Sequence, residues 1–351
     1  MNPPTKSESH AERVVALRTR IDDALPSLVE GRTPAALYEA VEHVLRTGGK
    51  RVRPVLLLLV AESYGASVDR ALPAALAVEV FHNFTLVHDD LMDGDEERRG
   101  APTVHAKWDP GTAVLTGDLM MGLSYDLLGQ VEGTDGEALY AVFHPMVEKL
   151  CAGQALDASF EDEEAVSVDA YLDMIDRKTG ALLAAAFELG GVIGEAAASA
   201  QDRLSTAGRL VGRAFQIQDD LLDLTADDDA WGRGVGGDLV QGKKTFLTLR
   251  ALERAEGAEH DWFARLVTDG GLPRNDVSEA RDRMARLGVF EEAREAVRSY
   301  TEQARDHLAG LPETAAAETL HWLLPPGGPF PKSGTIPSLH RPLPQPVSGP
   351  A

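Results

Sequence analysis

The pattern D-D-x-x-D occurs twice in this sequence, at residues 89–93 and 219–223, each time at the end of a long apolar stretch. On a helix, the first and last aspartates of the pattern lie about one turn apart on one face. Stacked carboxylates repel each other, and more strongly where they are partly buried. A fold with both copies therefore needs long helices to carry them and cations to offset their charge. Carboxylate oxygens suit Mg²⁺ for this purpose.

Helical patterns extend over most of the chain, because Ala, Leu, Glu and Arg dominate and alternating β-branched stretches are hard to find. Helices are expected at residues 34–45, 53–64, 71–93, 112–128, 136–158, 168–190, 196–224, 244–255, 277–287 and 290–308. The connections between them are short. We therefore predict a single all-α domain, a helical bundle over residues 1–323.

The last part of the chain has a different composition. Nine of the 20 prolines follow residue 323. Proline lacks the amide hydrogen that a helix needs, so residues 324–351 are expected to form a disordered tail. A proline-rich docking peptide is the less favoured alternative.

Charge and cysteine content exclude several classes of function. The chain has 56 acidic and 34 basic residues, a net charge of −22, and should repel nucleic acid. Its single cysteine excludes an internal disulfide framework and a multi-cysteine zinc site. Apolar runs stay far below the roughly 18 residues of a membrane span, and no secretory signal is visible. We expect a cytoplasmic protein that is not integral to a membrane.

Basic residues follow each acidic motif. Arg98 and Arg99 follow the first copy, while Arg233 and Lys243 follow the second. Metal ions on the carboxylates would neutralise bridging phosphate oxygens, and guanidinium groups would bind the terminal ones. A solvated acidic helix end would explain one copy alone. Two copies with flanking bases predict a site for a metal-bound diphosphate.

Three further features are weaker signals. Residues 48–53, Gly-Gly-Lys-Arg-Val-Arg, place three cations in four positions, which indicates a second anion site or, equally, a charged turn between helices. Lys178-Thr179-Gly180 interrupts an apolar helix, and His82 lies about one and a half turns before the cluster that begins at His88 and contains the first motif. A G-x-G-x-x-G pattern at residues 232–237 follows a helix rather than a strand, so it does not indicate a dinucleotide fold.

Together these motifs resemble the polyprenyl synthetase family, the trans-isoprenyl diphosphate synthases. The resemblance rests on GGKRVRP, HNFTLVHDDLMDGDEERRGAPTVH, GDLMMGLSYDLL, GQALD, DRKTGALLAAA and FQIQDDLLDL…GGDLVQGKKT, which occur in the family's order between residues 48 and 245. It implies a type I isoprenoid synthase bundle around a deep central cavity, usually a homodimer. It also implies condensation of isopentenyl diphosphate with an allylic diphosphate (dimethylallyl, geranyl or farnesyl), with three Mg²⁺ per active site.

The resemblance also implies roles for individual residues. Direct metal ligands would be Asp89, Asp93 and Asp219, with direct or supporting roles for Asp90, Asp220 and Asp223. The allylic diphosphate would be bound by Arg98, Lys178 and Lys243, with Arg233 as a weaker candidate. Isopentenyl diphosphate would be bound by Lys50, Arg53, His82 and Arg99. The reacting centre would be lined by Thr179 and Gln216, with support from Gln154, Asp157 and Asp238.

Two positions before the first motif bear on product length. Phe84 lies five residues before Asp89, and Thr85 lies four before it. By the resemblance, an aromatic residue at the fifth position argues against long products. Only two residues separate Asp90 from Asp93, not the four of many bacterial farnesyl synthases. This combination is similar to short-chain geranylgeranyl synthases, so we expect a geranylgeranyl (C20) product, with farnesyl (C15) as the alternative.

Two other functions fit parts of the pattern. A class I terpene cyclase also ionises allylic diphosphates, but usually has an N-D/S-E type second metal motif. This chain instead has a second D-D-x-x-D and a basic cluster, with Lys50 and Arg53, that would serve a second substrate. A non-catalytic subunit of a heteromeric synthase should have lost an aspartate or an arginine of the motifs, and none is lost here. We therefore expect an active prenyltransferase.

Overall fold

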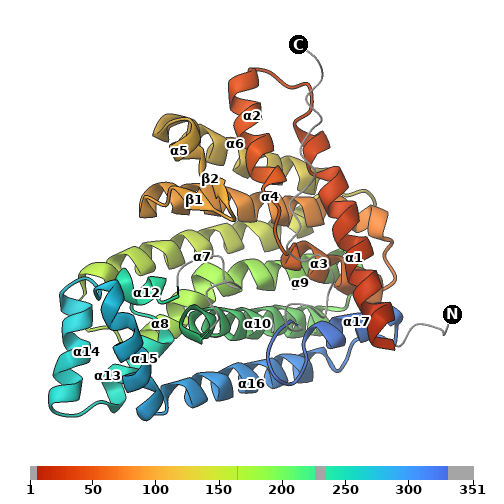
Figure 1. Ribbon diagram of the computed structural model, residues 1–351. Coiled ribbons are helices and arrows are strands. Elements are labelled where there is room, and N and C mark those ends of the chain that lie inside the picture. Colours follow the sequence, from red (N-terminus) through yellow and green to blue (C-terminus); the bar gives the residue numbers. More distant parts are fainter. Residues whose placement is uncertain (1–5, 164, 226–234, 331–351) are drawn as a thin grey trace.

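Helices dominate the structure, a computed structural model that describes residues 6–163, 165–225 and 235–330 (Figure 1). The longer helices are α1 (Lys6–Ala24), α2 (Ala35–Arg46), α3 (Val52–Ser63), α4 (Val68–Asp93), α6 (Pro110–Gly129), α7 (Gly136–Asp162), α8 (Val168–Ile175), α9 (Ala181–Ile193), α10 (Ala198–Thr225), α13 (Phe246–Arg254), α14 (Ala258–Thr268), α15 (Val277–Arg286), α16 (Val289–Leu308) and α17 (Ala315–Leu323). Shorter elements are η1 (Pro26–Leu28), α5 (Val104–Lys107), the π-helical turn η2 (Asp176–Gly180), α12 (Gly237–Val240) and η3 (Arg274–Asp276). The prediction of an all-α fold is confirmed.

A small hairpin interrupts the helices directly after α4. Its strands β1 (Glu97–Arg98) and β2 (Ala101–Pro102) pair antiparallel, with Arg98 opposite Ala101. The two turn residues, Arg99 and Gly100, have positive φ angles of 55° and 76°. Positive φ at both central residues is typical of the two-residue turns that match the twist of a hairpin.

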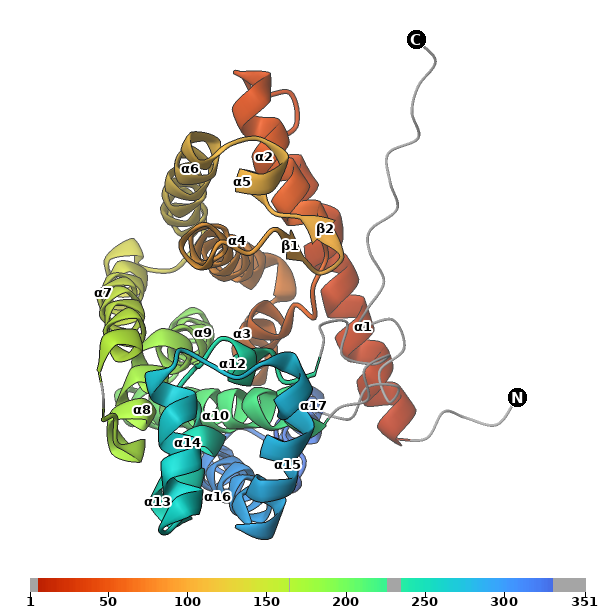
Figure 2. The same ribbon diagram turned by 60° about the vertical axis from the view of Figure 1, so that its left-hand side comes forward.

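The centre of the bundle is formed by α3 and α9, which are surrounded by other helices in the end-on view of Figure 2. Every residue of α3 from Pro54 to Ala61 is buried, as are 11 residues of α9. A helix that is apolar on every side is stable only inside a fold. One buried apolar cluster joins α1–α4, α6, α9 and α17, and a second joins α8 and α13–α15; α7, α10 and α16 contribute to both.

All ten predicted helices are present, with several differences in detail. Helices α1, α14 and α17 were not predicted from the sequence. The predicted helix over residues 168–190 is divided by the π-helical turn. Helix α4 begins three residues earlier than expected, because the Ser67 side chain caps it by accepting from the Arg70 amide.

Packing continues beyond the predicted domain boundary at residue 323. Leu324 is fully buried, and its carbonyl accepts a hydrogen bond from Arg305. The Phe330 ring packs edge-on against Phe215 at 5.7 Å between centroids. The first residues of the expected tail therefore belong to the folded body, while residues 331–351 lie outside the described part.

None of the helices in the described ranges combines the length and the apolar character that a membrane crossing requires.

Candidate active site

The first aspartate motif forms the last turn of α4, which ends at Gly94 in the left-handed conformation. Asp89 is partly buried, and desolvation raises its pKa; the charge of Asp93 acts in the same direction, while Lys178 opposes it. Asp90 is 5% exposed and pairs with the Nε of Arg98 on the hairpin. The pair of carboxylates that faces the site therefore consists of Asp89 and Asp93.

The second motif ends α10, and its middle aspartate, like Asp90 of the first motif, is buried. Asp220 is 4% exposed and accepts hydrogen bonds from the Tyr171 hydroxyl, the Gln216 amide (3.1 Å) and the Phe246 backbone amide (3.2 Å). Burial, followed by the charge of Asp238, raises the pKa of Asp220 to about 7.

The other two aspartates of this motif have different surroundings. Asp223 accepts a hydrogen bond from the Asp238 amide at 3.2 Å and is buried. Asp219 is partly exposed; burial lowers the pKa of Arg53, and the charges of Glu79 and Asp219 oppose this shift. Asp219 is therefore the accessible carboxylate of the second motif.

The π-helical turn places Lys178 and Thr179 beside both motifs. Lys178 Nζ donates to Asp157 Oδ2 at 2.6 Å, and the charges of Asp157 and Asp89 raise its pKa although burial would lower it. Thr179 Oγ1 donates to Gln216 Oε1 at 3.0 Å. A π-helical turn often marks a functional site, because it re-aims side chains within a helix.

Close helix packing fixes this turn. A Cβ at Gly153 of α7 would lie 2.3 Å from the Lys178 backbone nitrogen, and one at Gly212 of α10 would lie 2.6 Å from Gly180 Cα. Only glycine allows backbones to approach so closely. The position of Lys178 therefore depends on α7 and α10.

Lys243 connects the two motifs. Its Nζ lies 4.0 Å from Asp93 Oδ2, and its backbone amide donates to the carbonyl of Asp238 at 2.9 Å. The neighbouring Lys244 points elsewhere, because its Nζ donates to the carbonyl of Phe160. Arg233 lies outside the described residues.

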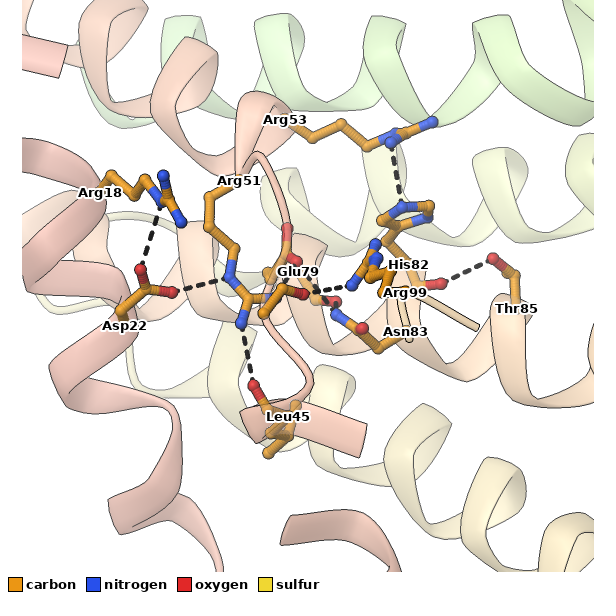
Figure 3. A network of polar contacts seen from close by, with 11 residues as sticks. Arg18, Asp22, Leu45, Arg51, Arg53, Glu79, His82, Asn83, Thr85 and Arg99 are labelled. Carbon is orange, nitrogen blue, oxygen red and sulfur yellow. Dashed lines mark hydrogen bonds and ion pairs between the residues drawn. The ribbon is translucent and has the colours of Figure 1, made fainter. Parts of the chain in front are cut away.

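A cluster of basic residues lies beside α4, as Figure 3 shows. Arg53 Nη1 is 3.2 Å from His82 Nε2, and Arg53 Nε is buried without a hydrogen-bond partner in the described part of the chain. Desolvation and the charges of Arg53 and Arg99 keep the pKa of His82 well below its usual value, so its ring is neutral. The buried, unpaired nitrogen of Arg53 indicates a place for an anion.

Arg99 extends this cluster from the hairpin. Its Nη1 donates to the carbonyl of Gly48, and a Cβ at Gly49 would lie 2.9 Å from the same nitrogen. Desolvation, together with the neighbouring arginines, lowers the pKa of Arg99 to about 10. Lys50 is exposed on the same loop. The hairpin and the glycine loop therefore meet at the basic cluster.

Arg51 does not join this anion site, although its sequence position suggested that it would. Its side chain is fully buried and donates to Asp22, Glu79 and the Leu45 carbonyl. Sequence reasoning missed Glu79, although a single acid in the apolar run of α4 was a visible signal. It also missed Tyr171, for which no local pattern gave a signal.

An aromatic group lies one turn before the first motif. Phe84 is 8% exposed, and its ring lies 5.1 Å from Phe81 and 4.9 Å from His88 between centroids. Phe81 also contacts Phe143 of α7 at 5.2 Å. Thr85 donates to the His82 carbonyl at 2.8 Å, so its hydroxyl is bonded within α4. Phe84 is thus part of a packed aromatic wall.

The carboxylates fit divalent cations. Asp89 and Asp93 lie on one face and offer oxygen ligands, and burial together with the charge of Asp93 raises the pKa of Asp89. Within the described ranges, no three His, Cys, Asp or Glu side chains form a ready metal site. Each ion would therefore be held by one or two carboxylates with water and phosphate oxygens, as is usual for Mg²⁺.

Comparison with known proteins assigns the chain to a family. The profile of the polyprenyl synthetase family matches residues 34–284. A geranylgeranyl diphosphate synthase of Methanosarcina mazei is 36% identical over 292 residues, covering 83% of this chain and 88% of the relative. A geranylfarnesyl diphosphate synthase of Natronomonas pharaonis is 36% identical over 340 residues, covering 90% and 96%.

A crystal structure of geranylgeranyl pyrophosphate synthetase from Pyrococcus horikoshii superposes with a TM-score of 0.84 at 36% identity, covering 90% of this chain and 98% of that one. The family match spans both aspartate motifs and the basic cluster. The chain therefore belongs to the polyprenyl synthetase family and is a trans-prenyl diphosphate synthase, a prenyltransferase of isoprenoid biosynthesis that acts on prenyl diphosphates and uses divalent metal ions.

Proposed function

We propose that this prenyltransferase makes geranylgeranyl diphosphate (C20) by Mg²⁺-dependent, head-to-tail condensation of isopentenyl diphosphate with an allylic diphosphate. The proposed product length rests on the buried ring of Phe84, which lies five residues before Asp89 and packs between Phe81 and His88. A rigid aromatic wall so close to the first aspartate motif limits the space for a growing prenyl chain. Farnesyl diphosphate (C15) is the alternative product.

The allylic diphosphate would bind between the two motifs. Asp89, Asp93 and Asp219 would hold three Mg²⁺, and these ions would supply positive charge to neutralise the diphosphate. Lys178 and Lys243 supply fixed positive charge on either side, because one lies near Asp89 and the other lies 4.0 Å from Asp93. Arg98 is oriented by Asp90 and Asp95. These preorganised charges stabilise the leaving diphosphate as the allylic C–O bond breaks.

Isopentenyl diphosphate would bind at the basic cluster of Lys50, Arg53, His82 and Arg99. The neutral His82 ring accepts from Arg53 and so orients the guanidinium, while the buried Arg53 Nε is left for the ligand. The burial of the Arg53 guanidinium strengthens its contact with a phosphate.

The condensation step follows from this placement of two diphosphates. The side-chain oxygens of Thr179 and Gln216 lie beside the second motif and would stabilise the allylic cation. Apolar walls exclude water, which would otherwise quench the cation. The π bond of isopentenyl diphosphate attacks the cation, a new C–C bond forms, and a proton leaves to the released diphosphate. The product is again allylic, so the cycle can repeat.

We further propose a homodimer, formed through α6 and α7. Large apolar side chains are exposed on these helices: Val114 (43%), Leu115 (59%) and Tyr140 (38%). A second copy of the chain would cover them. Light scattering coupled to gel filtration should give twice the mass of the chain, and a monomer would contradict this proposal.

A product assay tests the proposed function. The purified chain is incubated with Mg²⁺, isopentenyl diphosphate and dimethylallyl, geranyl or farnesyl diphosphate, and the dephosphorylated alcohols are sized. We expect a C20 alcohol from each primer. A C15 end point would retain the reaction but refute the product length, and a cyclic product or no condensation would favour a terpene cyclase or a non-catalytic subunit.

The Phe84→Ala variant tests whether the Phe84 ring limits the product length. Removing the ring should open space behind the first motif and shift the product to longer chains. Leu123→Ala is the matched control, because it removes a buried side chain of α6 from the same core but leaves the aromatic wall of Phe81, Phe84 and Phe143 intact. Equal product length in wild type and Phe84→Ala would remove Phe84 as the limiting residue.

A further inference from the structure

The loop between α2 and α3 carries Lys50 and leads into Arg53. Among the described residues, Gly48, Gly49 and Lys50 donate no backbone hydrogen bond. Gly48 and Gly49 have φ angles of 83° and 148°, which glycine adopts without steric cost. A loop of this composition is loose unless side chains fix it. The position of Lys50 therefore needs an anchor outside the backbone.

The buried side chain of Arg51 provides that anchor. Its Nε donates to Asp22 of α1 at 2.8 Å, its Nη1 to Glu79 of α4 at 2.6 Å, and its Nη2 to the carbonyl of Leu45 of α2 at 2.9 Å. A guanidinium group is a rigid plane, so three bonds in different directions fix its position. Figure 3 shows it directed toward Asp22 and Leu45, while Arg53 points toward His82.

The backbone of Arg51 is also in an unfavourable state. Its φ and ψ angles of 51° and 34° lie in the left-handed region, which side chains with a Cβ avoid. Such a conformation persists only where the surroundings hold it. The three bonds of the guanidinium therefore set the direction in which the chain enters α3, and with it the position of Arg53.

The charges around this anchor are balanced and buried. Glu79 is 2% exposed and also accepts from Asn83 Nδ2 at 3.0 Å, while Asp22 also pairs with Arg18 at 3.3 Å. Two arginines thus face two carboxylates, and loss of one partner leaves a buried charge uncompensated.

Glu79 connects the anchor to the anion site. Burial lowers the pKa of both Arg53 and Arg99, and the charge of Glu79 is the largest effect that opposes this. The same carboxylate therefore holds Arg51 and offsets the mutual repulsion of the arginines that face the ligand.

We propose that Arg51 is a positioning residue for the second diphosphate, which it does not touch. Its bonds to α1, α2 and α4 hold the glycine loop so that Lys50 and Arg53 converge on the ligand. This inference rests on the proposed function, which assigns the basic cluster to isopentenyl diphosphate.

Steady-state kinetics with Arg51→Met, Glu79→Gln and the double variant test the proposal. Both single variants should lower Tm, because each leaves a buried charge without its partner. Arg51→Met should raise KM for isopentenyl diphosphate by about tenfold or more, and KM for the allylic diphosphate should change by less than about twofold. The double variant removes both charges, so Tm should recover while KM for isopentenyl diphosphate stays high.

Three further variants make the result decisive. Arg18→Met removes the other arginine that pairs with Asp22 and should lower Tm without changing either KM. Arg51→Lys keeps the positive charge but not the rigid plane of the guanidinium group, so it should also raise KM for isopentenyl diphosphate. This variant replaces Arg51→Met in the test if Arg51→Met does not fold. Recovery of KM together with Tm in the double variant would overturn the proposal. If Arg53→Met leaves KM for isopentenyl diphosphate unchanged, the site assignment fails instead.

Discussion

Asp220 should make the metal-free enzyme less stable as the pH rises from 3.8, the ordinary pKa of an aspartate, to about 7, its pKa in the folded protein. Burial raises this pKa most, the charge of Asp238 adds to it, and hydrogen bonds from Tyr171 and Gln216 oppose it only in part. Between the two values the folded state binds more protons than the unfolded state. Stability is therefore fully present at low pH and is lost as the pH rises through the pKa of the folded state.

The size of the effect follows from the two pKa values. The interval from 3.8 to about 7 corresponds to about 4 kcal/mol, at roughly 1.4 kcal/mol per pH unit. The assay is urea unfolding with a chelator present, at a series of pH values across this interval, for wild type and Asp220→Asn. Asparagine keeps the shape and still accepts from Tyr171, but it does not titrate. The wild type should lose about 4 kcal/mol more than the variant.

Two outcomes would refute this reasoning. Parallel pH curves for wild type and Asp220→Asn would show that the buried carboxyl does not titrate between these values. Tyr171→Phe supplies the second check, because the Tyr171 hydroxyl lowers the pKa of Asp220. Without that hydrogen bond the loss of stability should extend to higher pH, and an unchanged curve would contradict the assigned contact.

Two further predictions concern groups on either side of the allylic site. Gly153→Ala should lower kcat by about tenfold or more, because the new Cβ would lie 2.3 Å from the Lys178 backbone nitrogen and would displace the π-helical turn. The circular dichroism of the helices should be retained. An unchanged kcat would contradict this packing. Lys243→Met should raise KM for the allylic diphosphate by about tenfold, because Lys243 lies 4.0 Å from Asp93. A rise in KM for isopentenyl diphosphate instead would place Lys243 at the other substrate.

Local patterns were sufficient to predict most of the fold. The ten expected helices are present because apolar periodicity and helix-ending glycines act within a few residues of sequence. Helix α1 was missed although Val14, Leu17 and Ile21 are buried at helical spacing, because charged residues are frequent before Val14 and on either side of Ile21. The individual roles of the aspartates and bases in binding metal and substrate stay predictions.

Contacts between distant segments could not be predicted in the same way. Lys50, Arg51 and Arg53 look alike in sequence, but a left-handed backbone at Arg51 turns its side chain into the core. That conformation depends on Asp22 and Glu79, which lie on other helices. Tyr171 and Asp220 meet only because α8 packs against α10, 49 residues further along the chain.

The doublets in the two aspartate motifs show how one pattern serves both structure and chemistry. Consecutive residues on a helix point about 100° apart, so two adjacent aspartates cannot face the same site. In each motif the first aspartate is partly exposed, while the second is buried at 5% exposure or less and bonded to a neighbouring element, Asp90 to Arg98 and Asp220 to Tyr171. The second aspartate therefore fixes the helix end, which sets the direction of the first. The spacing alone was therefore sufficient to predict that the first and last aspartates share one face of the helix. The partners of the buried aspartates, Arg98 and Tyr171, could be identified only from the structure.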